Sequence, residues 1–271
     1  MFAAAMGGNM NGISLHVGRG TSRKGLTVFP IWQERAAGRS VSIADDRLVR
    51  VSELADPVVG NLQVTVIVTS PVLVLDGDVL IGGWQDRVAI GSTLLAGGST
   101  TVINVRCVEQ ERWSGGQVHA VGGNRATAFV RGNSDQAEVW RRVQTEKQRA
   151  AQPLDISGLE PLPGQSGVLL GFGGKPALLE LFADDIMLAA AWPRILASAA
   201  REAAGADDTA TTGYRAREFI GLVDGMHLSA GELGGVGRTV EAVNGQLVLR
   251  GISDGHRLLH ASVINHHVVA A

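Results

Sequence analysis

The sequence has little of what several functional classes require. Its single cysteine, Cys107, excludes an intramolecular disulfide and a cysteine cluster for structural zinc or an iron–sulfur centre. Aromatic residues make up 4% of the chain, too few to suggest stacking platforms for single-stranded nucleic acid. With Lys+Arg 24 against Asp+Glu 26, the chain has no excess of positive charge to hold a phosphate backbone or an anionic membrane surface. We therefore expect no nucleic-acid or membrane partner.

Long apolar runs and targeting signals are also missing. The longest candidate, Ile186–Ala200, is interrupted by Trp192-Pro193-Arg194 and falls short of the roughly 18 apolar residues that cross a bilayer. The start has no basic residues before its short apolar run, unlike a secretory signal. We predict a disordered leader over residues 1–24, a cytoplasmic protein and no cofactor.

What the chain does have is glycine, 36 residues, among short β-branched segments. From Leu26 to Arg131 such segments are separated by Gly, Asp, Asn and Ser, which is typical of an antiparallel β domain. Asp76-Gly77-Asp78 indicates a hairpin turn. The predicted strands are Leu62–Thr69, Val72–Leu75, Val79–Ile81, Arg87–Gly91, Thr100–Glu109 and Ala126–Val130.

The second half has a different pattern. A helix is predicted after Asn133-Ser134-Asp135, and a second from about Asp184 to Ala203. Asn244-Gly245 is the strongest hairpin signal. The strands predicted here are Gly167–Gly171, Ala177–Phe182, Phe219–Val223, Thr239–Val243, Gln246–Arg250 and Arg257–Val263.

The predicted fold class is α+β and β-rich. An N-terminal antiparallel β-sandwich or open barrel (25–151) ends in a helix, and a smaller α+β module (166–271) follows. Prolines cluster in the stretch between them, residues 152–165, as in a linker or a surface crossing. One continuous domain is the alternative.

Two segments carry a resemblance: PVLVLDGDVLIGGWQDR (71–87) and NVRCVEQERW (104–113). Together they resemble the ADP-ribosylglycohydrolase and rhodanese-phosphatase associated protein domain, a bacterial family named for the genes it accompanies. Residues 182–196 are similar to its second half, so the resemblance covers most of the chain from about Leu26 onward. The resemblance implies a neighbourhood in ADP-ribose or nucleotide metabolism, without a mechanism.

Glu109 is the candidate catalytic residue. Strand alternation puts Ile103, Val105 and Cys107 on one apolar face and, continued, puts Glu109 on the core side, where a carboxylate needs a partner. We take Arg87 as the preferred partner, with Arg106 and Arg112 as alternatives. Glu109 would then act as an acid/base or bind a ribose hydroxyl, or else form a purely structural ion pair.

Six further residues are candidate ligand-binding residues. One turn presents a large aromatic and three polar side chains in succession, and an arginine and a second aromatic follow Glu109. The alternative is a tryptophan that covers the end of the sheet while Asp86 and Arg87 pair locally. The six are Trp84, Gln85, Asp86, Arg87, Arg112 and Trp113.

Other apparent motifs have plainer interpretations. Cys107 lies on an apolar strand face and is predicted to be an inert core residue. His266-His267 are adjacent strand residues that face opposite ways, so no metal site is expected. The glycine-rich stretches 171–175 and 231–237 are predicted to be turns, because neither leads from a strand directly into a helix.

Three functions remain open from the sequence. The leading one is a binding or interaction module that recognises an ADP-ribose- or nucleotide-like ligand. The second is an enzyme of ADP-ribose or nucleotide metabolism that uses Glu109 as acid/base. The third is a purely structural homo-oligomer.

Overall fold

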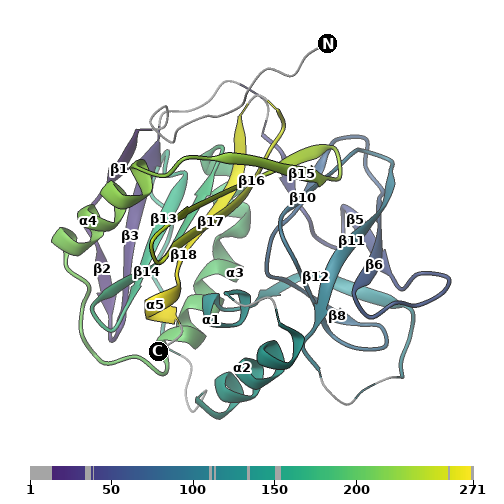
Figure 1. Cartoon of the computed structure of the whole chain (residues 1–271), viewed down its shortest axis with the longest axis horizontal. Helices are drawn as coiled ribbons and strands as arrows, with labels where there is room; N and C mark the ends of the chain where they lie inside the picture. Colours follow the sequence, from purple (N-terminus) through teal and green to yellow (C-terminus); the bar gives the residue numbers. More distant parts are fainter. Residues whose placement is uncertain are drawn as a thin grey trace.

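The computed structural model describes residues 14–33, 38, 40–109, 112, 114–132, 135–149, 154–255 and 257–269. Its two main bodies are a large sheet and a closed barrel, which lie side by side in Figure 1. The fold is β-rich α+β, as predicted.

The large sheet has nine antiparallel strands. Its central strands are buried along most of their length because a helix covers each face. Helix α3 (Asp185–Ala203) packs into one hydrophobic cluster with the sheet, and α4 (Gly213–Asp224) into another. The strands are β1 (Leu15–Val17), β2 (Thr21–Arg23), β3 (Leu26–Gln33), β13 (Gly167–Phe172), β14 (Lys175–Phe182), β15 (Ser229–Gly234), β16 (Gly237–Asn244), β17 (Leu247–Ser253) and β18 (Leu258–Asn265).

Six strands close the barrel in the order β11-β6-β5-β12-β8-β9. Its interior is packed mainly with valine, leucine and isoleucine, whose alternation along β6 is regular. Its strands are β5 (Val49–Ser52), β6 (Asn61–Val66), β8 (Asp78–Gly82), β9 (Arg87–Ala89), β11 (Thr100–Cys107) and β12 (Val118–Arg125). A small sheet of β4 (Ser42–Ile43), β7 (Val72–Val74) and β10 (Thr93–Leu95) adjoins it.

Two helices follow the barrel and one ends the described chain. Helix α1 (Ala128–Arg131) is a single turn capped by Thr127, and α2 (Gln136–Arg149) packs beside it. Helix α5 (His266–Val269) follows β18 directly. No helix in the described part of the chain is long and apolar enough to cross a membrane.

The structure corrects several local predictions. His266 and His267 begin helix α5 instead of lying in a strand, and residues 231–234 belong to strand β15 instead of a turn. Residues 15–17 and 21–23, inside the predicted disordered leader, form strands that pair with β3, whereas residues 1–13 lie outside the described residues. Residues 126–130 are not a strand, because Thr127 caps α1. Residues 219–223 belong to α4.

The predicted boundary at 152–165 is crossed by strand pairing. Strand β3, assigned by the sequence to the first unit, pairs along its length with β13 of the second. The N-terminal segment therefore builds the sheet of the second half. The division into domains stays a prediction.

Candidate functional sites

The two segments that carry the family resemblance meet at one end of the barrel. The turn between β8 and β9 packs against the end of β11, and buried Gln85 joins them. Its Nε2 donates to the Glu109 carbonyl oxygen (2.9 Å), and its Oε1 accepts from Arg87 Nη1 (2.8 Å) and Cys107 Sγ (3.0 Å). We call Gln85, Asp86, Arg87, Cys107, Glu109 and Arg112 the barrel-end cluster.

Glu109 is not a core residue, and Arg87 is not its partner. Strand β11 ends at Cys107, so the alternation stops two residues short and the Glu109 side chain is 34% exposed. Its carboxylate pairs with Arg112 (Nη2–Oε2 2.8 Å) and accepts the Asp86 backbone N–H (3.2 Å). The hydrogen bond from Arg112 lowers the Glu109 pKa, which makes this carboxyl a poor proton donor.

The other residues of this turn are also held by local bonds. Asp86 Oδ1 accepts the Gly82 N–H (2.8 Å) and pairs with Arg112 (3.2 Å) instead of Arg87. The Trp84 backbone N–H donates to Glu53 (3.1 Å). Trp113 lies outside the described residues.

The glycine at position 83 of this turn is required for steric reasons. Gly83 has φ +52°, and a Cβ there would lie 2.1 Å from His119 Nε2. His119 is buried and held by Glu53 (3.1 Å). Glycine is needed at position 83 because a side chain there would clash with the buried His119 imidazole at the end of the barrel.

A second polar cluster joins the barrel to the large sheet, and we call it the interface network. Buried Glu180 on β14 is paired with Arg125 (2.9 Å) and Arg131 (2.8 Å), which come from β12 and α1. Arg131 also pairs with Asp76 (2.9 Å). The members are Asp76, Ser92, Arg125, Arg131, Glu180, His260 and Ser262.

Burial opposes ionisation of Glu180, but the two guanidinium groups hold its pKa well below the usual range. Burial lowers the pKa of His260, so its imidazole is neutral near pH 7. His260 Nε2 therefore donates to Glu180 (2.8 Å), and Nδ1 accepts from the Ser92 hydroxyl (2.9 Å). The order serine–histidine–carboxylate is that of a serine-hydrolase relay, but the two ring nitrogens are exchanged, because in such a relay Nε2 faces the serine and Nδ1 the carboxylate. In addition, Ser92 is only 6% exposed and Glu180 is neutralised by arginines, so we assign the network to holding the two bodies together.

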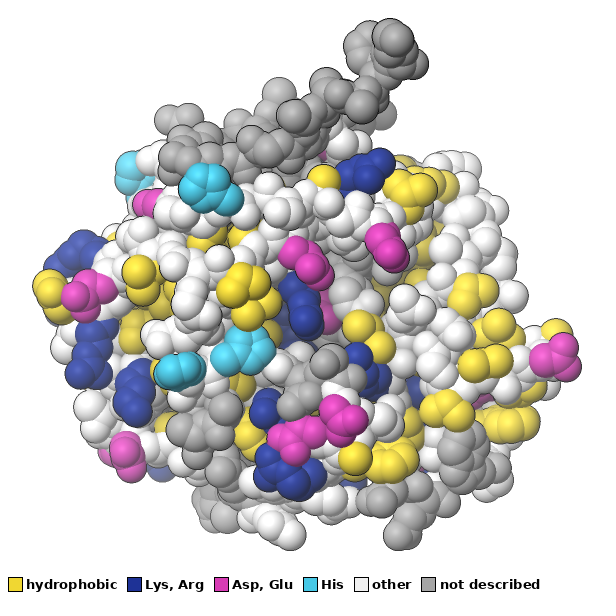
Figure 2. All heavy atoms as spheres, in the orientation of Figure 1, with side chains coloured by type: hydrophobic (Ala, Val, Ile, Leu, Met, Phe, Trp, Pro, Cys, Tyr) yellow, Lys and Arg dark blue, Asp and Glu magenta, His cyan; other side chains and the backbone are white. Residues whose placement is uncertain are grey.

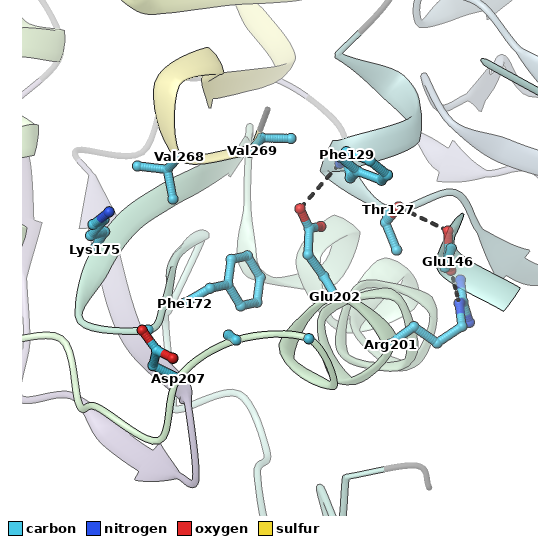
Figure 3. Close-up of a pocket in the computed structure, with 13 residues that line it drawn as sticks. Thr127, Phe129, Glu146, Phe172, Lys175, Arg201, Glu202, Asp207, Val268 and Val269 are labelled. Carbon is cyan, nitrogen blue, oxygen red and sulfur yellow. Dashed lines mark hydrogen bonds and ion pairs between the residues drawn. The ribbon is translucent and has the colours of Figure 1, made fainter. Parts of the chain in front are cut away.

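A cavity of about 250 Å³ lies beside α1, and we call it the α1 pocket. Its walls come from α1, α2, the β13–β14 turn, the end of α3 and α5 (Figure 3). In that view the Glu146–Arg201 ion pair (2.9 Å) stands at one end and Lys175 at the other. The lining residues are Thr127, Phe129, Glu146, Phe172, Gly173, Lys175, Arg201, Glu202, Gly205, Ala206, Asp207, Val268 and Val269.

Glu202 is the most perturbed carboxyl of this pocket. Its two oxygens accept the backbone N–H groups of Ala128 (2.8 Å) and Phe129 (3.1 Å), so a side chain of α3 caps α1. Burial raises its pKa to about 7, with a contribution from the neighbouring Glu146 carboxylate, although the two N–H groups act in the opposite direction. Glu146 itself accepts from Arg201 and from the Thr127 hydroxyl (3.1 Å). The Glu202 and Glu146 carboxyl groups of the pocket thus lie in different environments.

The sequence interpretation missed this pocket. Its residues come from five separated segments, and residues 126–130 were predicted to be a strand. The one local signal was Thr127 before Ala128-Phe129-Val130, a cap that precedes apolar residues. Within the described residues, no group of three His, Cys, Asp or Glu side chains is placed to hold a metal ion.

Comparison with known proteins supplies one match. The family model described as "ARG and Rhodanese-Phosphatase-superfamily-associated Protein domain" matches residues 14–157 and 154–264. No curated protein and no solved structure matches the chain.

Proposed function

This chain belongs to the ARG and Rhodanese-Phosphatase-superfamily-associated Protein domain family, and we propose that it is a binding module for a small nucleotide-like ligand. We place the ligand in the α1 pocket. The observation that carries this proposal is a cavity that combines carboxyl groups, a lysine and aromatic side chains in one small volume. Polar groups that converge on a cavity beside aromatic and aliphatic side chains are a feature of small-molecule sites.

The chemistry of the lining suits a ribose phosphate. The carboxyl groups of Glu202 and Asp207 can accept ribose hydroxyls, and the ammonium group of exposed Lys175 can meet a phosphate at the rim. Phe172 lies between Lys175 and Glu202 and offers an apolar face to the sugar (Figure 3). A volume of about 250 Å³ suits one sugar phosphate and not an intact dinucleotide.

The barrel-end cluster supports ligand binding less well. Its polar side chains bond mainly to one another, and Glu109 is held ionised by Arg112. The enzyme that uses Glu109 as acid/base is therefore the weaker proposal. Homo-oligomerisation is a separate prediction that chromatography with light scattering tests.

A bacterial, cytoplasmic setting is part of the proposal. It is supported by buried Cys107, which is the only cysteine in the sequence, and by the bacterial family that the sequence resembles. On the face in Figure 2, basic and acidic side chains lie next to each other instead of in separate patches, which favours a small ligand over nucleic acid.

A thermal-shift panel with ribose 5-phosphate, ADP, ADP-ribose and NAD tests the proposal. Saturation at 100 times the Kd adds about 2.7 kcal/mol, which raises the melting temperature by several degrees. We expect a shift from ribose 5-phosphate that Asp207→Asn reduces. Asp208→Asn is the matched control, because Asp208 is its exposed neighbour outside the pocket lining. No shift with any ligand, or equal shifts in the two variants, would contradict the proposal.

A further inference from the structure

A second cavity, of about 200 Å³, adjoins the α1 pocket. Glu146 and Arg201 line both cavities, so their ion pair lies at the junction of the two. Apart from this pair and Lys147, the second lining is aliphatic, and we call it the valine groove. Its aliphatic residues are Val79, Val88, Val108, Ala126, Val130 and Val143.

The groove runs between the outer wall of the barrel and α2. Val79 and Val88 come from the paired strands β8 and β9, and Val143 from the facing side of α2. Aliphatic walls of this kind hold water poorly and gain free energy when an apolar surface covers them. The occupant of the groove should therefore be apolar on its faces.

The polar residues of the groove lining are Glu146 and Arg201, at the junction with the α1 pocket, and the exposed Lys147. A flat heteroaromatic ring fits this arrangement, because the planar guanidinium of Arg201 can stack on it while Glu146 and Lys147 meet its edge atoms. An acyl chain would cover the same valines but would press methylene groups against the Glu146–Arg201 pair, which costs desolvation.

We propose that the ligand is a nucleotide whose ribose phosphate lies in the α1 pocket and whose base lies in the valine groove. This inference rests on the proposed function and adds the substrate class to it. It requires the base to contribute affinity of its own, separate from that of the ribose phosphate.

Calorimetric titration with AMP and ribose 5-phosphate tests the inference, because AMP carries adenine at C1 where ribose 5-phosphate carries a hydroxyl. We expect AMP to bind wild type at least tenfold more tightly than ribose 5-phosphate. Val143→Asp should remove that advantage and leave the affinity for ribose 5-phosphate unchanged. Val118→Asp is the control, because Val118 lies 64% exposed on the barrel and outside the groove lining.

Val143→Thr keeps the shape of the side chain and serves if the aspartate variant does not fold. It should reduce the AMP advantage severalfold. If ribose 5-phosphate binds in an Asp207-dependent manner but AMP gains nothing from the groove, the inference fails and the proposed function stands. If neither ligand binds, both fail. Tighter binding of decanoate than of AMP would assign the groove to an acyl chain and overturn the inference.

Discussion

The barrel-end cluster and the α1 pocket differ in how their polar groups are used. At the barrel end, Gln85, Asp86 and Arg112 bond to neighbouring groups of the same turn and strand end. In the α1 pocket, Glu202 caps α1 with both oxygens but also lines an open volume together with Asp207 (Figure 3). The sequence motif therefore marks the residues that close one end of the barrel, whereas the pocket is lined by residues from separate segments of the chain.

The two regions also depend on different supports. The barrel end is held by local bonds and by the fit of His119 over Gly83. The pocket depends on α1, a single turn whose Arg131 reaches Glu180 on the large sheet. Substitutions that remove each support in turn should therefore affect one region and leave the other intact.

The largest effect is expected from Glu180→Gln. This change leaves Arg125 and Arg131 without their buried carboxylate, and removal of one partner of such a pair costs about 3–5 kcal/mol. Urea denaturation should show this loss, whereas Glu241→Gln, at an exposed pair of 4.0 Å, should stay within about 0.5 kcal/mol.

The Glu180 pKa also gives a pH dependence. Because this pKa is depressed in the folded state, its contribution to stability is present above the unfolded pKa and is lost as the pH falls through the folded value. The wild type should therefore lose stability in acid more steeply than Glu180→Gln. Parallel curves would show that the network does not stabilise the fold.

Gly83→Ala should destabilise the barrel end by about 1–3 kcal/mol, through strain at positive φ and the clash with His119. Gly60→Ala is the control, because nothing lies within 4 Å of a Cβ there. Thermal unfolding measures both. An unchanged midpoint for Gly83→Ala would refute the steric explanation of the motif.

Glu202→Ala removes the acceptor for two N–H groups of α1, and we expect a cost of about 0.5–2 kcal/mol, as for loss of a helix cap. Glu202→Gln tests the titration. Since the folded pKa is about 7 and the ordinary value 4.5, the folded state binds more protons between these values, and stability falls as the pH rises through them. Chemical denaturation at pH 5 and pH 8 should show this fall in the wild type and not in Glu202→Gln.

The smallest effect is expected at Glu109. Glu109→Gln breaks the ion pair with Arg112. Both side chains of this pair are about one-third exposed, and such a pair is worth about 0.2–1 kcal/mol. Ligand shifts should be unchanged in this variant. Loss of binding with retained stability would instead return the ligand site to the barrel end.

Much of the sheet architecture could be predicted because β-branched runs and turn residues are local signals. The Asn244-Gly245 hairpin between β16 and β17 is confirmed, with Gly245 at φ +58°. Cys107 is buried, as its strand face predicted. The strand predicted over Phe219–Val223 is wrong, because Phe219, Ile220 and Val223 share one buried face of helix α4, and a short apolar run does not distinguish a strand from a helix.

Neither the α1 pocket nor the interface network could be predicted from local patterns, because both join segments that are far apart in the sequence. Glu180 lies 55 residues from Arg125 and 49 from Arg131, and no spacing selects one pair among many charged residues. The error over Glu109 is different, because strand alternation was extended past the last strand residue, Cys107. Periodicity predicts a face only while the strand continues.

Chemical-shift mapping by nuclear magnetic resonance, with AMP titrated into the full chain, distinguishes the α1 pocket from the barrel end as the ligand site. We expect the perturbed backbone amides to cluster at Phe129, Gly173 and Ala206 around the α1 pocket. Perturbations centred on Gly83, Trp84 and Glu109 would contradict this expectation and place the ligand at the barrel end.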